Sequence, residues 1–253
     1  MRFIATVNSD VGIAKTINQD SVLLKHASSA KGEVLMAVVC DGMGGLDKGE
    51  LASKTVIMEF ADWFERELPY ELEMPDLEVI GAKWALMLKN LNVRLAAYGA
   101  HCGTELGTTF TGILFVGEEY VCVHVGDSRL YYIGGDIKQL TTDQTFIARE
   151  ISSGRMTEEE AKTDKRRNVL LQCVGASKEI EPQVLRGRTE KGVYMLCSDG
   201  FRHVITEEEM LESLAPINLM NKKAMNGNAR YLIDRIKARR ERDNISVVLI
   251  KAD

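Results

Sequence analysis

An apolar run at residues 34–40 leads directly into Asp41-Gly42-Met43-Gly44-Gly45, and this junction constrains the fold more than any other segment. A short apolar run that ends in glycines predicts a buried strand followed by a turn. The glycines also leave room for another group to approach the main chain closely. Taken alone, the segment would also fit an ordinary hairpin turn that contains one aspartate.

Aspartates border strand-like apolar runs in three further segments, Val125-Gly126-Asp127-Ser128, Leu196-Cys197-Ser198-Asp199-Gly200 and Arg242-Asp243-Asn244-Ile245. Four carboxylates gathered at one end of a fold would repel one another strongly unless a cation neutralised them. The repeated placement therefore predicts a metal site.

The chemistry of that site follows from its ligands, because Asp20, Asp41, Asp127, Asp199 and Asp243 offer only oxygen atoms. Oxygen ligands suit hard ions such as Mg²⁺ and Mn²⁺ better than zinc or copper. Two such ions about 3.5 to 4 Å apart would lower the pKa of a bridging water and clamp a phosphoryl group for in-line attack. Hydrolysis of a phosphate ester is the natural reaction.

The order of the predicted elements indicates an α+β domain in which helices cover a β-sandwich. Short strands at 2–8, 21–25 and 33–40 follow one another too closely for parallel crossovers, so we expect antiparallel pairing. Two amphipathic helices, at 47–68 and 76–98, should pack on one face of a sheet, and Pro69 should end the first. The later predicted strands are 108–116, 120–125, 129–133, 137–140, 183–188, 193–197 and 245–251, and the later helices are 206–215 and 228–240.

Residues 126–128 are expected to form a hairpin turn between the strands at 120–125 and 129–133. The polar segment at 143–168 predicts a surface excursion of the kind that often works as a lid over a site. No linker rich in proline or glycine divides the chain, so residues 1–253 should form a single domain with a flap subdomain at about 143–168.

Bulk properties exclude some classes of function. A formal net charge of −5 and a pI near 5.6 argue against a nucleic-acid-binding protein. Five cysteines, without a C-x-x-C spacing, are better explained as buried hydrophobic residues than as disulfides or zinc ligands. With no signal peptide and no apolar stretch of membrane-spanning length, the sequence predicts a cytoplasmic protein that does not enter membranes.

Taken together and in order, seven motifs resemble the metal-dependent serine/threonine protein phosphatases of the PPM, or type 2C, family in their compact bacterial form. This resemblance implies a central sandwich of two antiparallel sheets flanked by helix pairs, with the metals in a cleft at one end. The motifs are Gly12-x-x-Lys15-x-x-Asn18-Gln19-Asp20, Asp41-Gly42-Met43-Gly44-Gly45, Gly107-Thr108-Thr109, Val125-Gly126-Asp127-Ser128-Arg129, Leu140-Thr141, Ser198-Asp199-Gly200 and Arg242-Asp243-Asn244.

The same resemblance implies roles for the metal ligands. Asp41 would bridge two Mn²⁺ or Mg²⁺ ions, and Asp199 and Asp243 would complete the shell of the first. The carbonyl of Gly42 would bind the second ion, and Asp20 would hold one of its waters. A third, weaker ion is implied at Asp127, and Asn244 would support the loop that carries Asp243.

For catalysis, the resemblance implies that a water bridging two ions attacks phosphorus in line, without a phosphoenzyme, with Asp41, Asp20 and Lys15 as the catalytic residues. Lys15 stands where many members have the arginine that grips the substrate phosphate, so its contact with phosphate should be less directional. Met43 replaces the histidine proposed as the general acid in eukaryotic members, which leaves a metal-bound water to protonate the leaving alkoxide.

The implied substrates are phosphorylated proteins, those of a serine/threonine kinase, and we expect the chain to be a monomer. Two alternatives stay open at the level of sequence. One is a non-catalytic relative that binds phosphoproteins, because Lys15, and Gln144-Thr145 and Thr163-Asp164-Lys165 in the flap, depart from the family pattern. The other is a phosphatase that acts on a small phosphoester.

Overall fold

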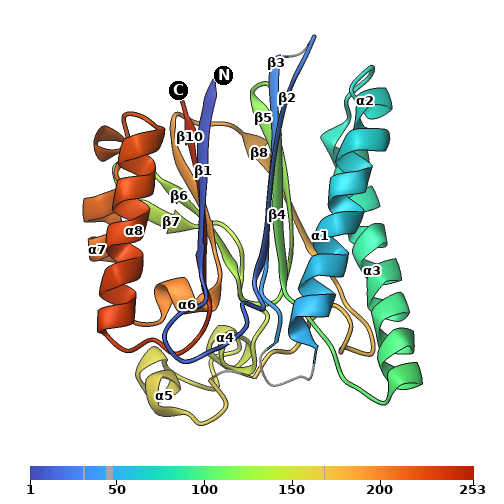
Figure 1. Ribbon diagram of the computed structural model, residues 1–253, viewed down its shortest axis with the longest axis vertical. Helices are drawn as coiled ribbons and strands as arrows, with labels where there is room; N and C mark the ends of the chain where they lie inside the picture. The colour runs from blue at the N-terminus through green and yellow to red at the C-terminus, as the bar shows by residue number, and fades with distance from the viewer. Residues whose placement is uncertain (31, 44–47, 168) are drawn as a thin grey trace.

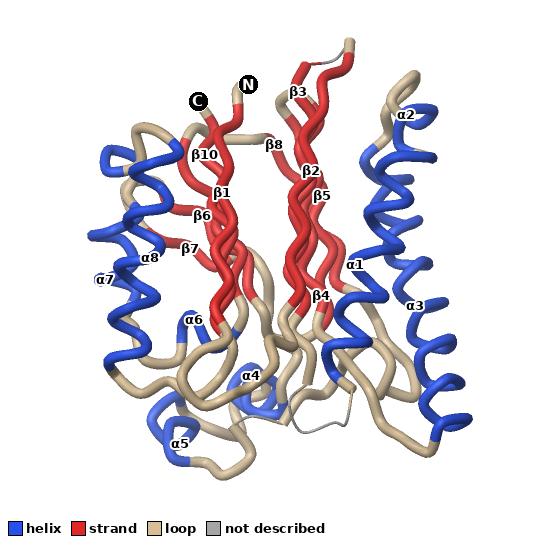
Figure 2. Tube along the Cα trace, viewed as in Figure 1, coloured by secondary structure: helices blue, strands red, loops and turns tan. Residues whose placement is uncertain are grey.

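The computed structural model describes residues 1–30, 32–43, 48–167 and 169–253. Gly44, Gly45, the predicted helix start at Asp47 and the last residue of the predicted flap, Asn168, lie outside the described residues. Two five-stranded sheets lie face to face in the centre of the molecule (Figures 1 and 2). The first has the order β1-β10-β9-β6-β7, formed by β1 (Phe3–Asp10), β10 (Ile245–Ala252), β9 (Gly192–Cys197), β6 (Arg129–Ile133) and β7 (Ile137–Gln139).

The second sheet has the order β2-β3-β4-β5-β8, and every strand pair in both sheets is antiparallel. Its strands are β2 (Ser21–Ser29), β3 (Gly32–Cys40), β4 (Phe110–Val116), β5 (Glu119–Val125) and β8 (Gln183–Arg188). The first predicted strand run therefore contributes to one sheet and the next two contribute to the other.

Helices cover both outer faces of the sandwich (Figure 1). The second sheet is covered by α1 (Gly49–Arg66), α2 (Leu68–Glu71) and α3 (Leu77–Cys102), and the first by α6 (Asp199–Arg202), α7 (Glu207–Leu214) and α8 (Lys222–Ala238), with the short 3₁₀ helix η1 (Pro216–Asn218) between the last two. Two more helices, α4 (Phe146–Ser152) and α5 (Glu158–Thr163), lie at the lower end of the view. The predicted four-layer α-β-β-α fold is confirmed.

Strand β3 shows why the core forms as it does. Leu35, Ala37 and Val39 pack into the layer between the two sheets, while Val34 and Met36 pack against α1 and α3. Because successive side chains point to opposite faces, a strand buried on both faces needs a continuous apolar run instead of an alternating one. The run at residues 34–40 meets that need.

Helix ends follow local capping chemistry. The Asp76 carboxylate accepts hydrogen bonds from the Glu78 and Val79 N–H groups at 2.8 and 3.2 Å, which starts α3. The prediction that Pro69 ends α1 is wrong, because α1 already ends at Arg66. Pro69 lies in the first turn of α2, where its missing N–H costs no hydrogen bond.

Helix α8 begins earlier than predicted, at Lys222 instead of about residue 228. The Asn221 side chain caps it by accepting a hydrogen bond from the Ala224 N–H at 3.0 Å. The sequence did not indicate this start, because the polar residues of the first turns lack the apolar periodicity of the rest of the helix.

Two predicted strand pairings are wrong. Strands β5 and β6 do not form a hairpin, because β5 pairs with β4 and β8 while β6 pairs with β7 and β9. Residues 126–128 therefore carry the chain from one sheet to the other. The first two strands, β1 and β2, likewise belong to different sheets. This crossing between sheets brings Asp127 to the end of the sandwich where both sheets contribute loops.

Strand register places the predicted site segments at one end. Asp10 is opposite Ile245, Cys197 is opposite both Val247 and Arg129, and Ser21 is opposite Cys40. The loops that follow β1, β3, β5 and β9 and the loop that precedes β10 lie at the end opposite the two termini (Figure 1). The fold thus gathers segments that are far apart in sequence.

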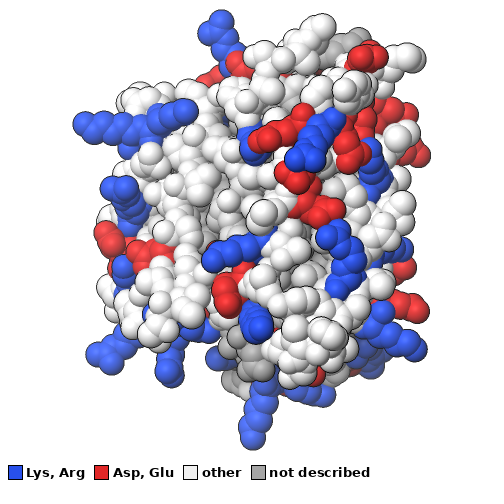
Figure 3. Space-filling view, turned by 45° about the vertical axis from the view of Figure 1, so that its right-hand side comes forward, with Lys and Arg blue, Asp and Glu red and all other residues white. Residues whose placement is uncertain are grey.

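The outer surface carries charges of both signs, interspersed over the face shown in Figure 3. Several pair between neighbouring helices; Lys83 of α3 lies 2.6 Å from Glu67 and 2.5 Å from Glu71. Such exposed pairs contribute little stability each. Of the helices that the structure describes, none has both the length and the apolar character that crossing a bilayer requires.

Candidate functional site

Asp41 emerges from the end of β3 with its backbone fully fixed. Its N–H donates to the Thr109 hydroxyl at 2.9 Å, and its carbonyl accepts from the Thr109 N–H and the Thr108 hydroxyl, both at 2.9 Å. The Thr109 hydroxyl also lies 2.8 Å from that of Ser128. These contacts lock the main chain and leave the carboxylate free to bind something else.

Asp20 comes from the segment before β2 and is almost fully buried, with 7% of its surface exposed. The Ser198 hydroxyl donates to its Oδ2 at 2.9 Å. Burial raises the pKa of Asp20 to about 7, helped by the nearby charges of Asp199 and Asp243 and opposed by hydrogen bonds from Ser246 and Ser198. Its second oxygen, Oδ1, is buried without a hydrogen-bond partner.

Two glycines allow the site segments to touch. A Cβ on Gly200 would lie 2.2 Å from the Asn244 carbonyl oxygen, so the turn after Asp199 packs directly on the turn of Asp243. A Cβ on Gly42 would lie 2.5 Å from the Gln19 carbonyl oxygen, and the Gly42 N–H donates to that same oxygen at 3.2 Å. Only glycine fits where main chains approach so closely.

Asn244 ties the Asp243 turn to the loop before β2. Its side-chain oxygen accepts from the Gln19 N–H at 2.9 Å, and its amide donates to the carbonyls of Val11 and Ile17 at 2.9 and 3.2 Å. The Asn244 N–H donates to the Asp243 carboxylate at 2.9 Å. These contacts support the predicted role of Asn244 in holding the loop that carries Asp243.

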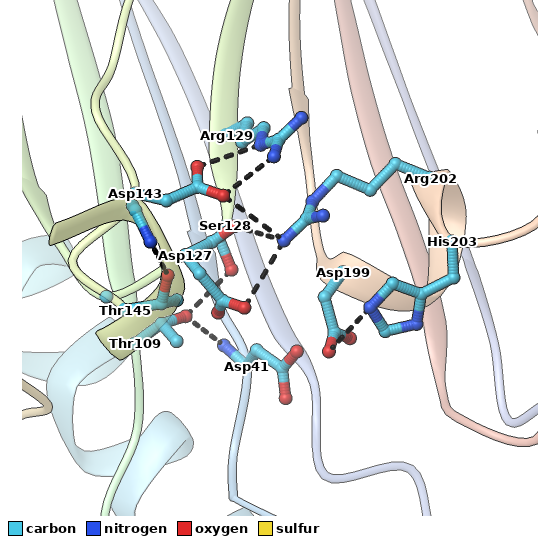
Figure 4. Close-up of polar contacts among 12 residues, drawn as sticks. Asp41, Thr109, Asp127, Ser128, Arg129, Asp143, Thr145, Asp199, Arg202 and His203 are labelled. Atoms are coloured by element: carbon cyan, nitrogen blue, oxygen red, sulfur yellow. Dashed lines mark hydrogen bonds and ion pairs between the residues drawn. The ribbon is translucent and has the colours of Figure 1, made fainter. Parts of the chain in front are cut away.

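The carboxylates of Asp20, Asp41, Asp199 and Asp243 form one electrostatic group, hereafter the aspartate group. Burial raises the pKa of Asp41 well above its usual value, and the charges of Asp20, Asp199, Asp127 and Asp243 raise it further. Figure 4 shows Asp41 and Asp199 turned toward the same space. Negative charge is thus concentrated where little in the chain neutralises it.

A divalent cation fits this group. Oδ1 of Asp20 and Oδ1 of Asp199 are buried with no hydrogen-bond partner, a costly state for an anionic oxygen that a hard cation would relieve. In the part of the chain that the structure describes, no three histidine, cysteine or acidic side chains already enclose a metal position. Carboxylates that repel one another are expected to stand apart until a cation draws them together.

Lys15 reaches the same end of the molecule. Its ammonium Nζ lies 3.4 Å from Oδ1 of Asp243, and the two side chains are 30% and 40% exposed. A partly exposed lysine beside the aspartate group could contact a phosphate that enters from solvent. Its predicted role in binding substrate stays a prediction.

His203 and Glu241 also belong to the site, and the sequence singled out neither as a site residue. His203 lies one helical turn after Asp199, with Nε2 3.4 Å from Asp199 and Nδ1 3.5 Å from Glu241. Glu241 in turn accepts hydrogen bonds from the N–H groups of Arg242 and Asp243 at 2.7 and 3.0 Å. Burial alone would lower the pKa of His203, but Glu241 and Asp199 raise it. This chain of contacts positions Asp199 relative to the Asp243 turn.

Asp127 lies in a different environment, a second group that also contains Asp143, Arg129 and Arg202 (Figure 4). Arg202 donates to the Asp127 carbonyl at 3.0 Å and to its Oδ2 at 3.2 Å, and lies 3.8 Å from Asp143. Arg129 donates to both oxygens of Asp143, at 2.8 and 2.7 Å. We call these four residues the paired group, because each aspartate has an arginine partner.

The base of the predicted flap is fastened next to Asp127. The Gln144 side chain accepts from the Gly126 N–H at 3.0 Å, and the Gln144 N–H donates to the Gly126 carbonyl at 2.8 Å. Helices α4 and α5 extend from this point, with the Arg166 guanidinium 4.2 Å from the centre of the Phe146 ring. The extent and motion of a flap subdomain stay predictions.

A cavity of about 820 Å³ lies at the other end of the molecule, between the loop that joins α2 to α3, the β4–β5 turn and the end of β8. Charged groups along it include Glu73, Asp76, Glu118 and Arg188, and none of the predicted site residues lines it. The aspartate group is the stronger candidate for catalysis, because several buried carboxylates act on one another there and two of their buried oxygens lack hydrogen-bond partners.

A sequence profile of the family described as Protein phosphatase 2C matches residues 13–231, which include Lys15, Asp20, Asp41, Asp127 and Asp199. This chain belongs to the protein phosphatase 2C family. Asp243 lies beyond the matched residues, and its place in the site comes from the contacts described above.

A relative of this protein phosphatase 2C chain is named as a serine/threonine protein phosphatase. The serine/threonine protein phosphatase PstP of Mycobacterium tuberculosis (strain H37Rv) is 33% identical over 213 residues, covering 81% of this chain and 38% of PstP. The chain therefore spans well under half the length of that relative.

Solved structures agree with the fold. Serine/threonine phosphatase Stp1 from Staphylococcus aureus has a TM-score of 0.86 and 25% identity, and the match covers 100% of this chain and 96% of Stp1. The catalytic domain of PstP, solved in complex with 2 manganese ions, has a TM-score of 0.77 and 30% identity over 98% of this chain and 97% of that domain.

Proposed function

We propose that this protein is a metal-dependent phosphatase that hydrolyses phosphoserine and phosphothreonine in proteins. The observation that carries the proposal is the convergence of Asp20, Asp41, Asp199 and Asp243, with two buried carboxylate oxygens that lack partners. Membership of the protein phosphatase 2C family and the name of PstP as a serine/threonine protein phosphatase support it.

Two divalent ions would be held by the aspartate group together with the Gly42 carbonyl, with Asp41 shared between them. When bound, Mn²⁺ or Mg²⁺ lowers the pKa of a water ligand and offsets the charge of a phosphoryl group. Asp127 is left out of this set of ligands, because Arg202 already pairs with it.

The chain's own contacts prepare these ligands. Ser198 fixes one oxygen of Asp20, and Asn244 and Glu241 hold the turn that presents Asp243. Preorganised ligands need little rearrangement when the site fills, which favours catalysis. Lys15 would steady the substrate phosphate through its mobile ammonium group, next to Asp243.

We also propose that the substrates are proteins phosphorylated by a serine/threonine kinase. The protein is proposed to act as a monomer. Four of the five free cysteines are buried, which supports work in a reducing compartment such as the cytoplasm. Within the aspartate group, excess negative charge disfavours contact with nucleic acid phosphates unless cations are bound.

Chelation followed by add-back of Mn²⁺ tests the proposal directly. We expect hydrolysis of a phosphothreonine peptide to stop in EDTA, to return with Mn²⁺ and to fail in Asp199→Asn under both conditions. The exposed Asp136→Asn is the matched control and should behave as wild type. Hydrolysis that persists in EDTA would contradict the mechanism.

The same assay separates the two alternatives. A non-catalytic phosphoprotein-binding relative would turn over neither the peptide nor p-nitrophenyl phosphate with Mn²⁺ present. A phosphatase for small phosphoesters would hydrolyse phosphorylated metabolites much faster than phosphopeptides. Faster turnover of phosphopeptides supports the proposed function.

A further inference from the structure

The paired group places a built-in cation against Asp127. Arg202 is the last residue of α6, the short helix that begins with Asp199, so it extends from the aspartate group toward Asp127. One nitrogen, Nη2, contacts both the carbonyl and the carboxylate of Asp127, at 3.0 and 3.2 Å. A carbonyl and a carboxylate oxygen are the two kinds of atom that a hard metal ion would use here.

Burial makes this contact hard to replace. The side chains of Arg202, Asp127 and Asp143 are 13%, 14% and 12% exposed, and that of Arg129 is 22% exposed. Removing one partner from a buried ion pair leaves an uncompensated charge in a poorly solvated place. Nε of Arg202 is buried without a hydrogen-bond partner. The guanidinium is therefore held through its Nη2 contacts with Asp127 and Asp143.

Charge balance separates the two groups. Within the paired group two aspartates face two arginines, so the charges of these four residues cancel one another. A metal ion at Asp127 would also lie next to the Arg202 guanidinium, and like charges at such short range repel strongly. The residues present at Asp127 therefore do not fit a third metal ion while Arg202 stays in place.

We infer that Arg202 fills the cation position beside Asp127, so that this chain binds two metal ions and uses an internal guanidinium where a third ion would otherwise sit. The inference rests on the proposed function, because it concerns the cations of the same site. It makes Arg202 a positioning residue, which holds Asp127 and the base of the 143–167 segment through Asp143.

Counting bound Mn²⁺ tests the inference without depending on catalysis. Metal-free protein is dialysed against a series of Mn²⁺ concentrations, and the ions per chain are measured. Wild type and Asp127→Asn should both bind two ions. Arg202→Gln should bind a third, at least tenfold more tightly than wild type binds any third ion, and Arg202→Gln/Asp127→Asn should return to two.

Matched variants keep the count interpretable. Arg186→Gln removes the same charge from β8, where Arg186 pairs with Glu78 at the start of α3, and should leave the count at two. Arg202→Met retains the aliphatic stem, so it repeats the test if glutamine destabilises the fold. Thermal unfolding of each variant shows that the counted protein is folded.

Each outcome decides something. A third ion in wild type that disappears in Asp127→Asn would overturn the inference, and so would a count that stays at two in Arg202→Gln and Arg202→Met. A raised KM with an unchanged count would assign Arg202 to substrate phosphate instead. A wild-type chain that binds no Mn²⁺ at all would overturn the proposed function itself.

Discussion

The aspartate group and the paired group lie side by side, yet their charges are balanced in different ways. In the aspartate group, burial and mutual repulsion raise the pKa of Asp41 far above its usual value. In the paired group, burial also opposes ionisation, but Arg129 and Arg202 hold the pKa of Asp143 below its usual value. Among the described residues, the four carboxylates of the aspartate group have only Lys15 and His203 beside them, whereas each aspartate of the paired group has an arginine partner.

This difference indicates which carboxylates need an external cation to balance their charge. Asp20 and Asp199 each retain a buried oxygen without a partner, whereas both oxygens of Asp143 accept hydrogen bonds from Arg129. Burial and the charge of Asp199 raise the pKa of Asp127 to about 6 against the influence of Arg202, which places Asp127 between the two extremes. Each group therefore responds differently when one charge is removed.

The largest expected effect comes from neutralising the centre of the aspartate group. Asp41→Asn should lower kcat for a phosphothreonine peptide by more than a hundredfold. Removing a residue that only supports a metal ligand typically costs about 10- to 100-fold, and Asp41 is proposed to bind both ions directly. Steady-state kinetics with saturating Mn²⁺ measures the loss.

Thermal unfolding sharpens the same test. In EDTA, Asp41→Asn should be more stable than wild type, because it removes a buried carboxylate that its neighbours repel. Adding Mn²⁺ should then stabilise wild type more than the variant, since ligand binding to the folded state raises stability. A wild-type protein that is more stable than Asp41→Asn in EDTA would argue against repulsion in the aspartate group.

Next in size is the cost of breaking the paired group. Asp143→Asn should destabilise the fold by about 3 kcal/mol, because it leaves Arg129 and part of Arg202 without a counter-charge in a largely buried place. Urea unfolding measures the change in free energy. Adding Mn²⁺ should not restore the loss, in contrast to the aspartate group.

A double-mutant cycle provides the control. Arg129→Gln/Asp143→Asn should be less destabilised than the sum of the two single variants, since each single variant strands the other residue's charge. Additive losses would mean that the two side chains do not interact, and the distinction between the two groups would lose its basis.

A smaller effect concerns His124, which lies buried beneath the Gly126 turn. Its ring nitrogens lie 2.9 Å from the Thr111 hydroxyl and 3.0 Å from the Gly126 carbonyl, and burial lowers its pKa to about 4. The unfolded chain takes up a proton near pH 6.5, whereas the folded chain does so only near pH 4. Stability contributed by neutral His124 is therefore complete above pH 6.5 and falls as the pH drops toward 4.

Urea unfolding at pH 7.5 and pH 5 measures this contribution. Between these values wild type should lose about 2 kcal/mol more than His124→Gln does, because the variant has no imidazole to protonate. Both proteins keep the aspartate group, so its response to pH cancels in the comparison. Equal losses in the two proteins would show that His124 is not held neutral.

Sequence patterns were sufficient to place the strands and to mark three members of the aspartate group. The strand at residues 34–40 was evident from its continuous apolar run, and Asp41, Asp199 and Asp243 were evident from their places at strand borders. Their convergence needed either the family resemblance or the strand register, because nothing local in sequence indicates that residues 41 and 243 meet.

Sequence patterns missed features that depend on long-range pairing. The hairpin predicted between β5 and β6 satisfied every local rule, but Cys122 pairs with Leu185 and Leu130 pairs with Leu196, which draws the strands into different sheets. Arg202 was missed for the same reason. Its partner Asp127 is 75 residues away and is reached only because the chain crosses between the sheets there.

The smallest expected effect comes from Lys15, at the exposed edge of the aspartate group. Its contact with Asp243 is partly exposed, so it adds little stability, and Lys15→Met should leave the unfolding free energy within about 1 kcal/mol of wild type. KM for the phosphopeptide should rise up to about tenfold, because one charge-assisted contact to phosphate is lost. Lys15→Arg should restore KM to the wild-type value or below, since a guanidinium can grip phosphate with two hydrogen bonds. An unchanged KM in Lys15→Met would make Lys15 a surface residue and leave the aspartate group and its cations as the whole of the phosphate site.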